Sequence, residues 1–402
     1  MPDQSQITLR ILLLNQFFHP DTAATSQILT DLARHLALQG HDVTVICGNS
    51  DYAAAADPTP APPVTVIRSK PLPFSRSTLS RLASYASYFL TATLHSLHGP
   101  TPEVVLTLTT PPLLSLVGTI AKRLRSARHF IWEMDLYPDV AVDLNVFRHN
   151  SALTKVVGFL ADHSRHRADG IIALGDDMKE RLIARGIVGD KIQVVHNWAD
   201  RSEIRPQPLP PMPLTVHYSG NLGLAHDTAT IQQAIFSLAG QEQIRFVFAG
   251  GGPQRKALQE FCQSNNLRQV VFRPYCDRDQ LSNSLAEGHL GLVTQKPATT
   301  GSIVPSKVYG IMAAGRPLLY IGSAKATPAR IIQRFDCGWT VEPGDSAQLV
   351  ALLLRLAATP DLIRDAGQRA RRAFVDHFDR GIAVSQISKI LGAEEQSLAA
   401  TA

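Results

Sequence analysis

Residues 300–317 join a glycine-containing turn to a helix that is predicted to begin at Pro305 and Ser306. Serine is a favoured helix cap because its hydroxyl accepts a backbone N–H that the first turn leaves free. Free N–H groups and the helix dipole favour negative charge at that end, so the segment is suited to bind an anion. Lys307 lies in the first turn, where a cation is disfavoured unless it faces a bound anion. The alternative is a surface lysine on an ordinary buried helix.

Three carboxylates follow a strand that is predicted at residues 129–132. Glu133, Asp135 and Asp139 lie just past the carboxyl end of this strand. Open α/β sheets bind their ligands at this edge, so these side chains are candidates for contact with a ligand. For Asp135 the structural alternative is a helix cap or an ion pair with Arg148.

Two glycine-rich loops follow strands that we predict in the second half of the chain. Residues 219–223 form a tight loop after a first strand, and residues 250–253 follow a second strand, with Arg255 at the start of the next helix. The glycines at 250–252 have a purely structural alternative, which is close packing of a helix on a strand. The loop after the first strand of the whole chain lacks the Gly-x-Gly-x-x-Gly pattern, so no dinucleotide site is expected there.

The elements that must position these residues alternate between strands and helices. A strand at residues 9–14, a helical pattern at 28–36 and a strand at 43–47 predict parallel pairing through a right-handed crossover. A proline-rich stretch at 205–213 cannot form a helix or a central strand, so we expect it to link two domains. The strand–helix pattern then restarts. We predict an α/β chain with domains at residues 1–204 and 214–380, a linker at 205–213, and a terminal segment at 381–402.

One predicted helix, at residues 77–97, carries an apolar side next to a group of basic residues. Arg68, Lys70, Arg76 and Arg81 lie at or just before its start. An apolar face beside a basic cluster can dock on an anionic bilayer. The alternative is that the helix packs on the sheet.

The composition excludes several classes of protein. The 402 residues are 45% hydrophobic and 18% charged, which is typical of globular proteins and, at this length, of two domains. The net charge of +5 is compatible with anionic small ligands or anionic lipid and is too small to indicate nucleic acid. Four cysteines without a Cys-x-x-Cys pair indicate neither a disulfide framework nor a zinc site, and they fit a reducing cytosol. The sequence predicts no leader peptide and no membrane span.

Ordered motifs along most of the chain resemble those of one family. They lie at residues 18–21, 31–33, 40–43, 135–139, 195–198, 218–223, 248–253, 304–309 and 312–317. Their order and spacing resemble the GT-B fold and, more narrowly, the family-four retaining glycosyltransferases, which use nucleotide-sugar donors. The Asp-Leu-Tyr-Pro and Pro-Ser-Lys segments look most like transferases that build bacterial surface polysaccharides, including the colanic-acid and O-antigen fucosamine type.

The resemblance implies two Rossmann-like domains that face a central cleft, with the donor site on the second domain and the acceptor site on the first. It also implies that the last helix, at residues 381–391, crosses back to the first domain. A sugar would pass from a nucleotide-diphosphate donor to a glycan or polyprenyl-linked acceptor, with no nucleic acid involved. No cofactor and no metal are expected, because cations and helix dipoles replace a metal in this fold.

The chain departs from the family pattern at the donor site. Members usually carry two glutamates eight positions apart, one near the donor sugar and phosphate and one on the ribose hydroxyls. The corresponding residues here are Ser302 and Gly310. The usual arginine after the first glycine loop is replaced by Asn221, and no lysine follows before the helix. The diphosphate is therefore expected to depend more on Lys307 and on backbone N–H groups of the two loops.

The resemblance assigns roles to individual residues. Lys307 would stabilise the leaving diphosphate, Ser306 and Ile303 would donate N–H groups, and Asp135 would orient the acceptor or the donor sugar. We predict donor contacts from Gly220, Asn221, Gly223, Gly251, Gly252, Arg255, Tyr275, Ser302, Ile303, Pro305, Ser306 and Tyr309, and acceptor contacts from His19, Asp21 and Thr22.

Three functions compete at this point. The first is an active glycosyltransferase in the cytoplasm, in peripheral contact with the inner face of the plasma membrane. The second is a non-catalytic, glycosyltransferase-like subunit that binds a partner or a glycan, which the two missing glutamates favour. The third is a sugar-nucleotide 2-epimerase of the same fold, although the second half shows no converging carboxylates and histidines for that reaction.

Overall fold

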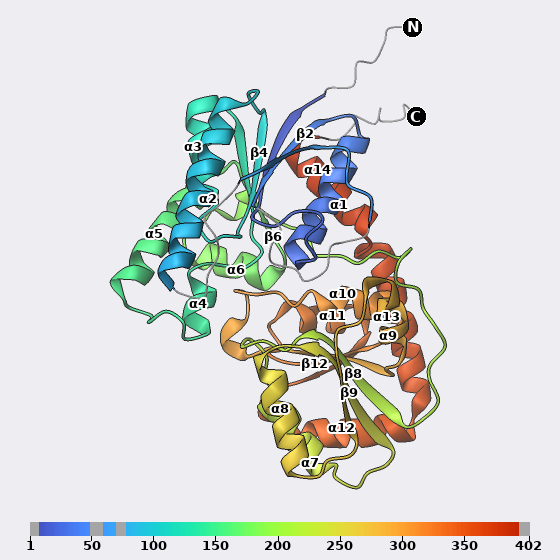
Figure 1. Cartoon of the computed structure of the whole chain (residues 1–402). Coiled ribbons are helices and arrows are strands. Elements are labelled where there is room, and N and C mark those ends of the chain that lie inside the picture. The colour runs from blue at the N-terminus through green and yellow to red at the C-terminus, as the bar shows by residue number, and fades with distance from the viewer. Residues whose placement is uncertain (1–7, 49–58, 70–77, 394–402) are drawn as a thin grey trace, which may run out of the picture. The chain divides into compact units, whose positions relative to one another are not determined.

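The computed structural model describes residues 8–48, 59–69 and 78–393, without the side chains of residues 78–84. The chain divides into two compact units, each built on one parallel sheet (Figure 1). Unit 1 comprises Met1–Leu174, Lys179–His196 and Gly381–Ala402. Unit 2 comprises Gly175–Met178 and Asn197–Arg380. The alternating pattern of strands and helices thus gives two Rossmann-like α/β folds, as the sequence predicted.

The sheet of unit 1 has seven parallel strands in the order β3-β2-β1-β4-β5-β6-β7. The inner strands β4, β5 and β6 are buried along nearly their whole length because helices cover both faces. The strands are β1 (Arg10–Leu14), β2 (Asp42–Cys47), β3 (Thr65–Arg68), β4 (Val104–Leu108), β5 (Arg128–Trp132), β6 (Gly170–Ala173) and β7 (Ile192–Val194).

Helices lie on both sides of this sheet, with α2, α3 and α5 on one side and α1 and α14 on the other (Figure 1). The helices of unit 1 are α1 (Ala24–Leu38), α2 (Thr78–His98), α3 (Ser115–Arg125), α4 (Asp139–Asp143), α5 (Ala152–Arg167), α6 (Asp176–Ala184) and α14 (Arg380–Leu391), with a 3-10 turn η1 (Gly189–Lys191).

The last helix, α14, belongs to unit 1, whereas residues 197–380, which directly precede it, belong to unit 2. Val384, Ile387 and Leu391 are buried. The Ser388 hydroxyl donates to the Gln39 side chain over 2.8 Å, and Arg128 donates to the carbonyl of Leu391 over 2.8 Å. The helix is therefore part of the core of unit 1, and its predicted return to the first domain is confirmed.

The sheet of unit 2 has six parallel strands in the order β10-β9-β8-β11-β12-β13. Two apolar clusters lie on its opposite faces, one under α7, α8 and α12 and the other under α10 and α11. The strands are β8 (Leu214–Asn221), β9 (Ile244–Gly251), β10 (Val270–Arg273), β11 (Leu290–Thr294), β12 (Leu318–Ile321) and β13 (Gly338–Val341).

The helices of unit 2 follow the strands in regular alternation. They are α7 (Ala229–Ser237), α8 (Pro253–Ser264), α9 (Leu281–Ala286), α10 (Lys307–Ala313), α11 (Thr327–Phe335), α12 (Ser346–Ala358) and α13 (Pro360–His377), with 3-10 turns η2 (Arg278–Gln280) and η3 (Pro297–Thr299). The short helices α4, α9 and α11 were not predicted. For α11 a signal existed, since Pro328 occupies the first turn and Ile331 and Ile332 share the buried side.

The proline-rich stretch at residues 205–213, which the sequence predicted to link two domains, lies within unit 2 and is held there by one buried guanidinium. Arg316 donates to the carbonyls of Gln207, Pro208 and Ala286. Burial lowers the pKa of Arg316. These bonds hold the extended segment at the start of β8, so Arg316 has a structural role.

The inner side of α2 differs from the one that its apolar pattern predicts. Its predicted apolar side included Leu90 and Leu94, but these side chains are 61% and 46% exposed. Tyr88 and Ala92 face the core instead, and the Tyr88 hydroxyl donates to the carbonyl of Ile46. The helix does pack on the sheet, but a row of leucines remains on its outer side.

No single helix among the described residues combines the length and hydropathy of a membrane span. Only α12 and α13 taken together, bent by 99° at their junction, meet that test by length and composition.

We predict that Ile387→Ala on α14 lowers the free energy of unfolding of unit 1 by about 2–4 kcal/mol, because it leaves a cavity in a packed core. Urea denaturation of the full chain, followed by circular dichroism, measures this loss. Gln386→Ala, at an exposed position of the same helix, is the matched control and should unfold as the wild type does. Equal unfolding midpoints for both variants would contradict the placement of α14 in the core.

Candidate functional site

The first candidate site lies at the carboxyl ends of β8 and β11 in unit 2. The strand order reverses between these two neighbours, and ligands of open α/β sheets bind where this reversal opens a crevice. Three segments come together there. They are the end of β8 at Gly220 and Asn221, the end of β9 at Gly250 and Gly251, and the start of α10 at Lys307.

The glycines at this edge allow close approach of backbone and side chains. β8 and β9 extend further than predicted, so that Gly220 pairs with Gly250 and Asn221 with Gly251. Gly220 has φ of 126°, and a Cβ atom there would lie 2.6 Å from Cε of Lys307. A Cβ on Gly250, with φ of 123°, would lie 2.2 Å from the Gly220 carbonyl oxygen. Any larger residue at Gly220 or Gly250 would therefore displace β8 or the Lys307 side chain.

Lys307 is a partly buried cation without a carboxylate partner among the residues that the structure describes. Its Nζ lies 5.3 Å from the centroid of the Tyr218 ring, which provides a cation–π contact. Burial lowers the pKa of Lys307 to about 8. Since a buried charge normally has a counter-charge, this lysine is placed to bind an anion that comes from outside the chain.

Two further residues of this site, Tyr218 and His226, were missed as functional candidates. Nδ1 of His226 lies 3.0 Å from the carbonyl of Gly223, and its Nε2 lies 3.0 Å from the Tyr218 hydroxyl. Burial, and then the charge of Lys307, lower the pKa of His226 to about 4, so the imidazole is neutral at pH 7. The Tyr218 hydroxyl also donates to the carbonyl of Asn221 over 2.7 Å. The pair fixes the loop after β8.

The turn before α10 uses its own N–H groups. The amides of Ser302 and Ile303 both donate to the Thr299 carbonyl, and Gln295 donates to the carbonyls of Thr299 and Ile303. Ser302 and Ile303 therefore have no amide available for a ligand in this structure, which corrects the role predicted for them. The sequence analysis did not predict that Gln295, just after β11, fixes this turn.

Helix α10 begins at Lys307 with Ser306 at the N-cap position, as predicted, but without the predicted capping bond. Ser306 makes no capping hydrogen bond with its side chain and is exposed, next to the partly buried Pro305. Among the described residues, the amides of residues 306–308 have no hydrogen-bond partner. The free N–H donors at this end of the helix are therefore those of residues 306–308. Of the two N–H donors that were predicted, Ser306 and Ile303, only Ser306 is in this set.

Three positions that the sequence connected with the donor lie in the packing of unit 2. Tyr309 is fully buried, with its ring 5.4 Å from that of Phe378, so the prediction of a donor contact from its side chain is wrong. Ser302 is fully buried and its hydroxyl lies 3.2 Å from the Thr299 carbonyl. A Cβ on Gly310 would lie in ordinary contact with Ile204 and Leu285. Tyr309 faces inward because it follows the same helical period as the buried Met312.

The remaining predicted donor residues lie at the carboxyl end of β9. Arg255 donates to the carbonyl of Arg273 over 3.2 Å and stacks over the Phe272 ring at 5.4 Å, so its contacts are within unit 2. Tyr275 is 61% exposed, and a Cβ on Gly251 would lie 2.9 Å from its ring. Gly252 and Gly223 lie close to Asn221. An exposed aromatic ring beside bare backbone offers a surface on which a flat group can stack.

The second candidate site lies at the carboxyl ends of β1, β4 and β5 in unit 1. The strand order reverses between β1 and β4, and the amide of Gln16 after β1 donates to the carbonyl of Thr110 after β4. His19 contacts the carbonyl of Thr59 through Nε2 at 2.8 Å. The loop after β1 is therefore tied to its neighbours in the sheet.

The acceptor residues predicted in this loop differ in exposure. Asp21 is 2% exposed and accepts from the amide of Ala23 over 2.7 Å, just before α1 begins. Its carboxylate therefore serves the start of the helix, and the structure does not place it at the surface. Thr22 is exposed.

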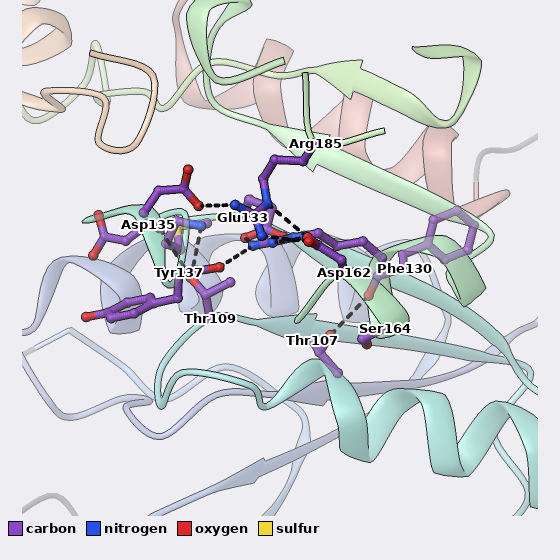
Figure 2. A network of polar contacts seen from close by, with 12 residues as sticks. Thr107, Thr109, Phe130, Glu133, Asp135, Tyr137, Asp162, Ser164 and Arg185 are labelled. Atoms are coloured by element: carbon purple, nitrogen blue, oxygen red, sulfur yellow. Dashed lines mark hydrogen bonds and ion pairs between the residues drawn. The ribbon is translucent and has the colours of Figure 1, made fainter. Parts of the chain in front are cut away.

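Arginines bind most of the carboxylates after β5 (Figure 2). Glu133, 1% exposed, pairs with Arg165 over 2.7 Å, and Arg165 also donates to the carbonyl of Tyr137. Asp162 pairs with both Arg165 and Arg185. Asp139 pairs with Arg185 over 3.0 Å and with Arg181 over 3.2 Å. These ion pairs fix the path of residues 133–139.

Asp135 differs from its neighbours because no side-chain partner of its carboxylate is found among the described residues. Its amide and that of Met134 donate to the Thr109 hydroxyl over 3.3 and 3.1 Å (Figure 2). Burial, and then the charge of Glu133, raise the pKa of Asp135 to about 6. It neither caps a helix nor pairs with Arg148, so the structural alternative is not supported. Asp135 is the carboxylate of this group that can meet a ligand.

Within the described residues, no group of three or more His, Cys, Asp or Glu side chains lies close enough to hold a metal ion.

Comparison with known families matches both units. The family described as "Glycosyl transferase 4-like domain" matches residues 24–198, and the family "Glycosyl transferases group 1" matches residues 200–373. The chain is 28% identical to "Probable glycosyltransferase WbjE" of Pseudomonas aeruginosa, over 62% of this chain and 65% of that protein, just under two thirds of its length. It is 25% identical to "Putative colanic acid biosynthesis glycosyl transferase WcaI" of Escherichia coli K12, over 85% of this chain and 91% of that protein.

Solved structures share the fold at lower identity. Sucrose-phosphate synthase of Thermosynechococcus elongatus superimposes with a TM-score of 0.75 at 17% identity, over 95% of this chain and 98% of that one. Anabaena Alr3699/HepE, solved in complex with UDP-glucose, has a TM-score of 0.70 at 17% identity, over 96% of this chain and all of that one. These likenesses establish the GT-B fold.

We predict that Asp135→Asn stabilises the free protein at pH 7.5 by about 1–2 kcal/mol, because it removes a charge that burial disfavours. The folded-state pKa of about 6 lies above the ordinary value of 3.8, so folding takes up a proton between these values. The stability of the wild type relative to the variant therefore falls as pH rises through 6.

Thermal denaturation at pH 5.0 and 7.5 measures this difference, which should shrink at the lower pH. Asp139→Asn is a control for which the change in stability should have the opposite sign. It breaks the ion pairs with Arg181 and Arg185, so it should destabilise the protein. A destabilised Asp135→Asn at pH 7.5 would show that the carboxylate has a partner.

Proposed function

Because the chain belongs to the family-four glycosyltransferases of the GT-B fold, we propose that it transfers a sugar from a nucleotide-diphosphate donor to a glycan or lipid-linked acceptor. The proposed transfer retains the configuration of the anomeric carbon. Unit 2 binds the donor and unit 1 the acceptor. The product belongs to a bacterial surface polysaccharide.

The observation that carries this proposal is the environment of Lys307. A lysine whose pKa burial lowers to about 8, with no carboxylate partner among the described residues, is costly to the free protein. Nucleotide-diphosphate sugars all contain a negatively charged diphosphate, which would supply the missing counter-charge for Lys307. The exposed Ser306 and the amides of residues 306–308 add N–H donors at the same end of α10.

The proposed chemistry needs a leaving group rather than a protein nucleophile. The bond between the anomeric carbon and the β-phosphate oxygen breaks, and negative charge develops on the diphosphate, where Lys307 stabilises it. The acceptor oxygen forms the new bond on the same face of the sugar, and its proton passes to the departing phosphate oxygen. Asp135, with a carboxylate free of arginine, orients the acceptor hydroxyl or the sugar.

A uridine or related nucleotide fits the proposal. Anabaena Alr3699/HepE, which shares the fold, binds UDP and UDP-glucose. In unit 2, the exposed ring of Tyr275 beside Gly251 offers a stacking surface for the base. The ribose lacks a carboxylate partner at Gly310, so its hydroxyls would be bound by backbone groups or by another residue.

The polysaccharide assignment rests on the curated relatives. One is described by its role in colanic acid biosynthesis, and the aligned region covers 91% of its length. The four cysteines are free, which suits a cytoplasmic enzyme that acts at the inner face of the plasma membrane.

A non-catalytic subunit is the second candidate, because both positions of the family glutamates serve packing here. Ser302 closes a turn, and Gly310 lies against Ile204 and Leu285. Release of nucleoside diphosphate from UDP-, GDP- and dTDP-sugars, with a membrane extract as the source of acceptor, separates the two functions. Donor binding without release of diphosphate would favour the second candidate.

We predict that Lys307→Met weakens binding of nucleoside diphosphate by about 10- to 100-fold, because a charge-assisted contact contributes about 1.5–3 kcal/mol. The same substitution should raise the thermal stability of the unliganded protein at pH 7, since it removes an unpaired charge. Isothermal titration calorimetry with UDP, GDP and dTDP, together with thermal denaturation, measures both effects.

Lys256→Met is the matched control, because Lys256 is 83% exposed on α8 of the same unit. It should leave both affinity and stability at wild-type values. Unchanged nucleotide affinity in Lys307→Met would overturn the role given to Lys307.

A further inference from the structure

Three helices of unit 1 form a continuous outer layer over one face of the sheet. α3 packs against α2 on one side and α5 on the other (Figure 1). Their inner sides bury Tyr88 and Ala92 of α2, Val117 and Ala121 of α3, and Ala161 of α5. Their outer sides therefore form one surface, which we call the α2–α3–α5 face.

This face carries an unusual share of the exposed apolar side chains. Seven of the sixteen large hydrophobic residues exposed among the described residues belong to these three helices. Phe159 is 71% exposed and Val156, one turn before it, is 55% exposed. Scattered exposed hydrophobics are normal, whereas a group on adjacent helices indicates an interaction surface. The seven are Leu90, Leu94, Ile120, Leu124, Leu153, Val156 and Phe159.

The same helices are rich in positive charge. α2, α3 and α5 contain seven lysines and arginines and one acidic residue. Arg165 is one of the seven, but it is buried and pairs with Glu133, so it does not add charge to the face. The single acid, Asp162, is bound to Arg165 and Arg185. On the described outer side Arg123, Lys155 and Arg167 are exposed.

A hollow of about 660 Å³ lies between α3 and α5 on this face. It is lined by Thr119, Lys122, Arg123, His163 and Arg167. Lys122 is partly neutralised, since its ammonium lies 2.6 Å from the Asp169 carboxylate. Arg123 and Arg167 present guanidinium groups, which bind phosphate oxygens with two parallel hydrogen bonds.

We propose that the α2–α3–α5 face docks on an anionic lipid bilayer, with Phe159, Val156 and their apolar neighbours in the interface and Arg123 and Arg167 on lipid phosphates. The face presents both apolar and cationic side chains, and these are the two kinds of group by which interfacial helices bind anionic lipid. Four basic residues were predicted for membrane contact from the sequence. Of these, Arg68 ends β3 and donates to the carbonyl of His19, and Arg81 lies in the first turn of α2. Lys70 and Arg76 fall outside the described residues, as does the side chain of Arg81. The helices α3 and α5 were not part of that prediction.

Charge complementarity favours a bilayer over a second copy of the chain. A two-fold dimer through this face would bring two sets of like charges together, which is unfavourable. An anionic leaflet attracts each lysine or arginine near its surface by about 1 kcal/mol, roughly a fivefold gain in binding per charge. The proposal concerns only the binding of unit 1 to lipid and does not depend on the proposed transfer reaction.

Sedimentation of the full chain with vesicles tests the proposal. We expect binding to vesicles of phosphatidylcholine with one third phosphatidylglycerol, little binding to phosphatidylcholine alone, and weaker binding as salt is raised. Replacing Lys122, Arg123 and Arg167 together by Gln should lower the partition coefficient by roughly 100-fold. Val156→Ser with Phe159→Ser should lower it by about tenfold or more.

Matched controls separate the face from general charge and hydrophobicity. Lys256→Gln, Lys325→Gln and Arg372→Gln remove the same charge from exposed positions of unit 2. Val188→Ser with Phe236→Ser removes an exposed valine and phenylalanine elsewhere. Both control sets should bind vesicles as the wild type does, and circular dichroism should show all variants folded.

Three results would overturn the proposal. One is equal binding to neutral and anionic vesicles, and another is equal loss of binding in the face variants and their controls. The third is absence of vesicle binding together with a concentration-dependent dimer that Phe159→Ser disrupts, which would show that a second copy covers this face.

Discussion

The proposed donor site depends on one unfavourable placement. The charge of Lys307 lies against Gly220 and the Tyr218 ring, without a carboxylate partner in the described residues. The surrounding features make this placement possible. Gly220 and Gly250 keep β8 and β9 close, and His226 with Tyr218 fixes the loop that follows. The unpaired charge lowers the stability of the free protein, and under the proposed function a bound diphosphate would supply the counter-charge. The site is thus prepared for an anion before the anion arrives.

In unit 1 most of the buried charges are paired within the chain. Its carboxylates after β5 are numerous, but Arg165, Arg181 and Arg185 neutralise most of them. The network fixes the loop. Within the described part of the chain it leaves Asp135 as the carboxylate without an arginine, and the pKa of Asp135 is raised to about 6. The ion pairs therefore distinguish the structural carboxylates from Asp135, the candidate functional carboxylate. Residue type alone does not make this distinction.

The fold was predictable from the sequence because each strand and most helices have a clear apolar period, and the proline-rich segment marks the second domain. The position of Lys307 was also predictable, since the sequence places it at a helix start after a glycine turn. The contacts of individual residues around Lys307 could not be predicted from the sequence. Whether the amides of Ser302 and Ile303 are free depends on Gln295, seven or more residues away, and the inward side of Tyr309 and of α2 depends on packing. His226 became visible only through its distance to Tyr218.

The most direct test of the central claim is the number of protons taken up when nucleoside diphosphate binds. Calorimetry at pH 8.5 in two buffers of different ionisation enthalpy measures it, with whichever of UDP, GDP and dTDP binds most tightly. If the diphosphate binds Lys307, whose pKa is about 8 in the free protein, binding should take up roughly half a proton or more. The uptake should disappear in Lys307→Met. No uptake by the wild type, or equal uptake by both proteins, would contradict the account.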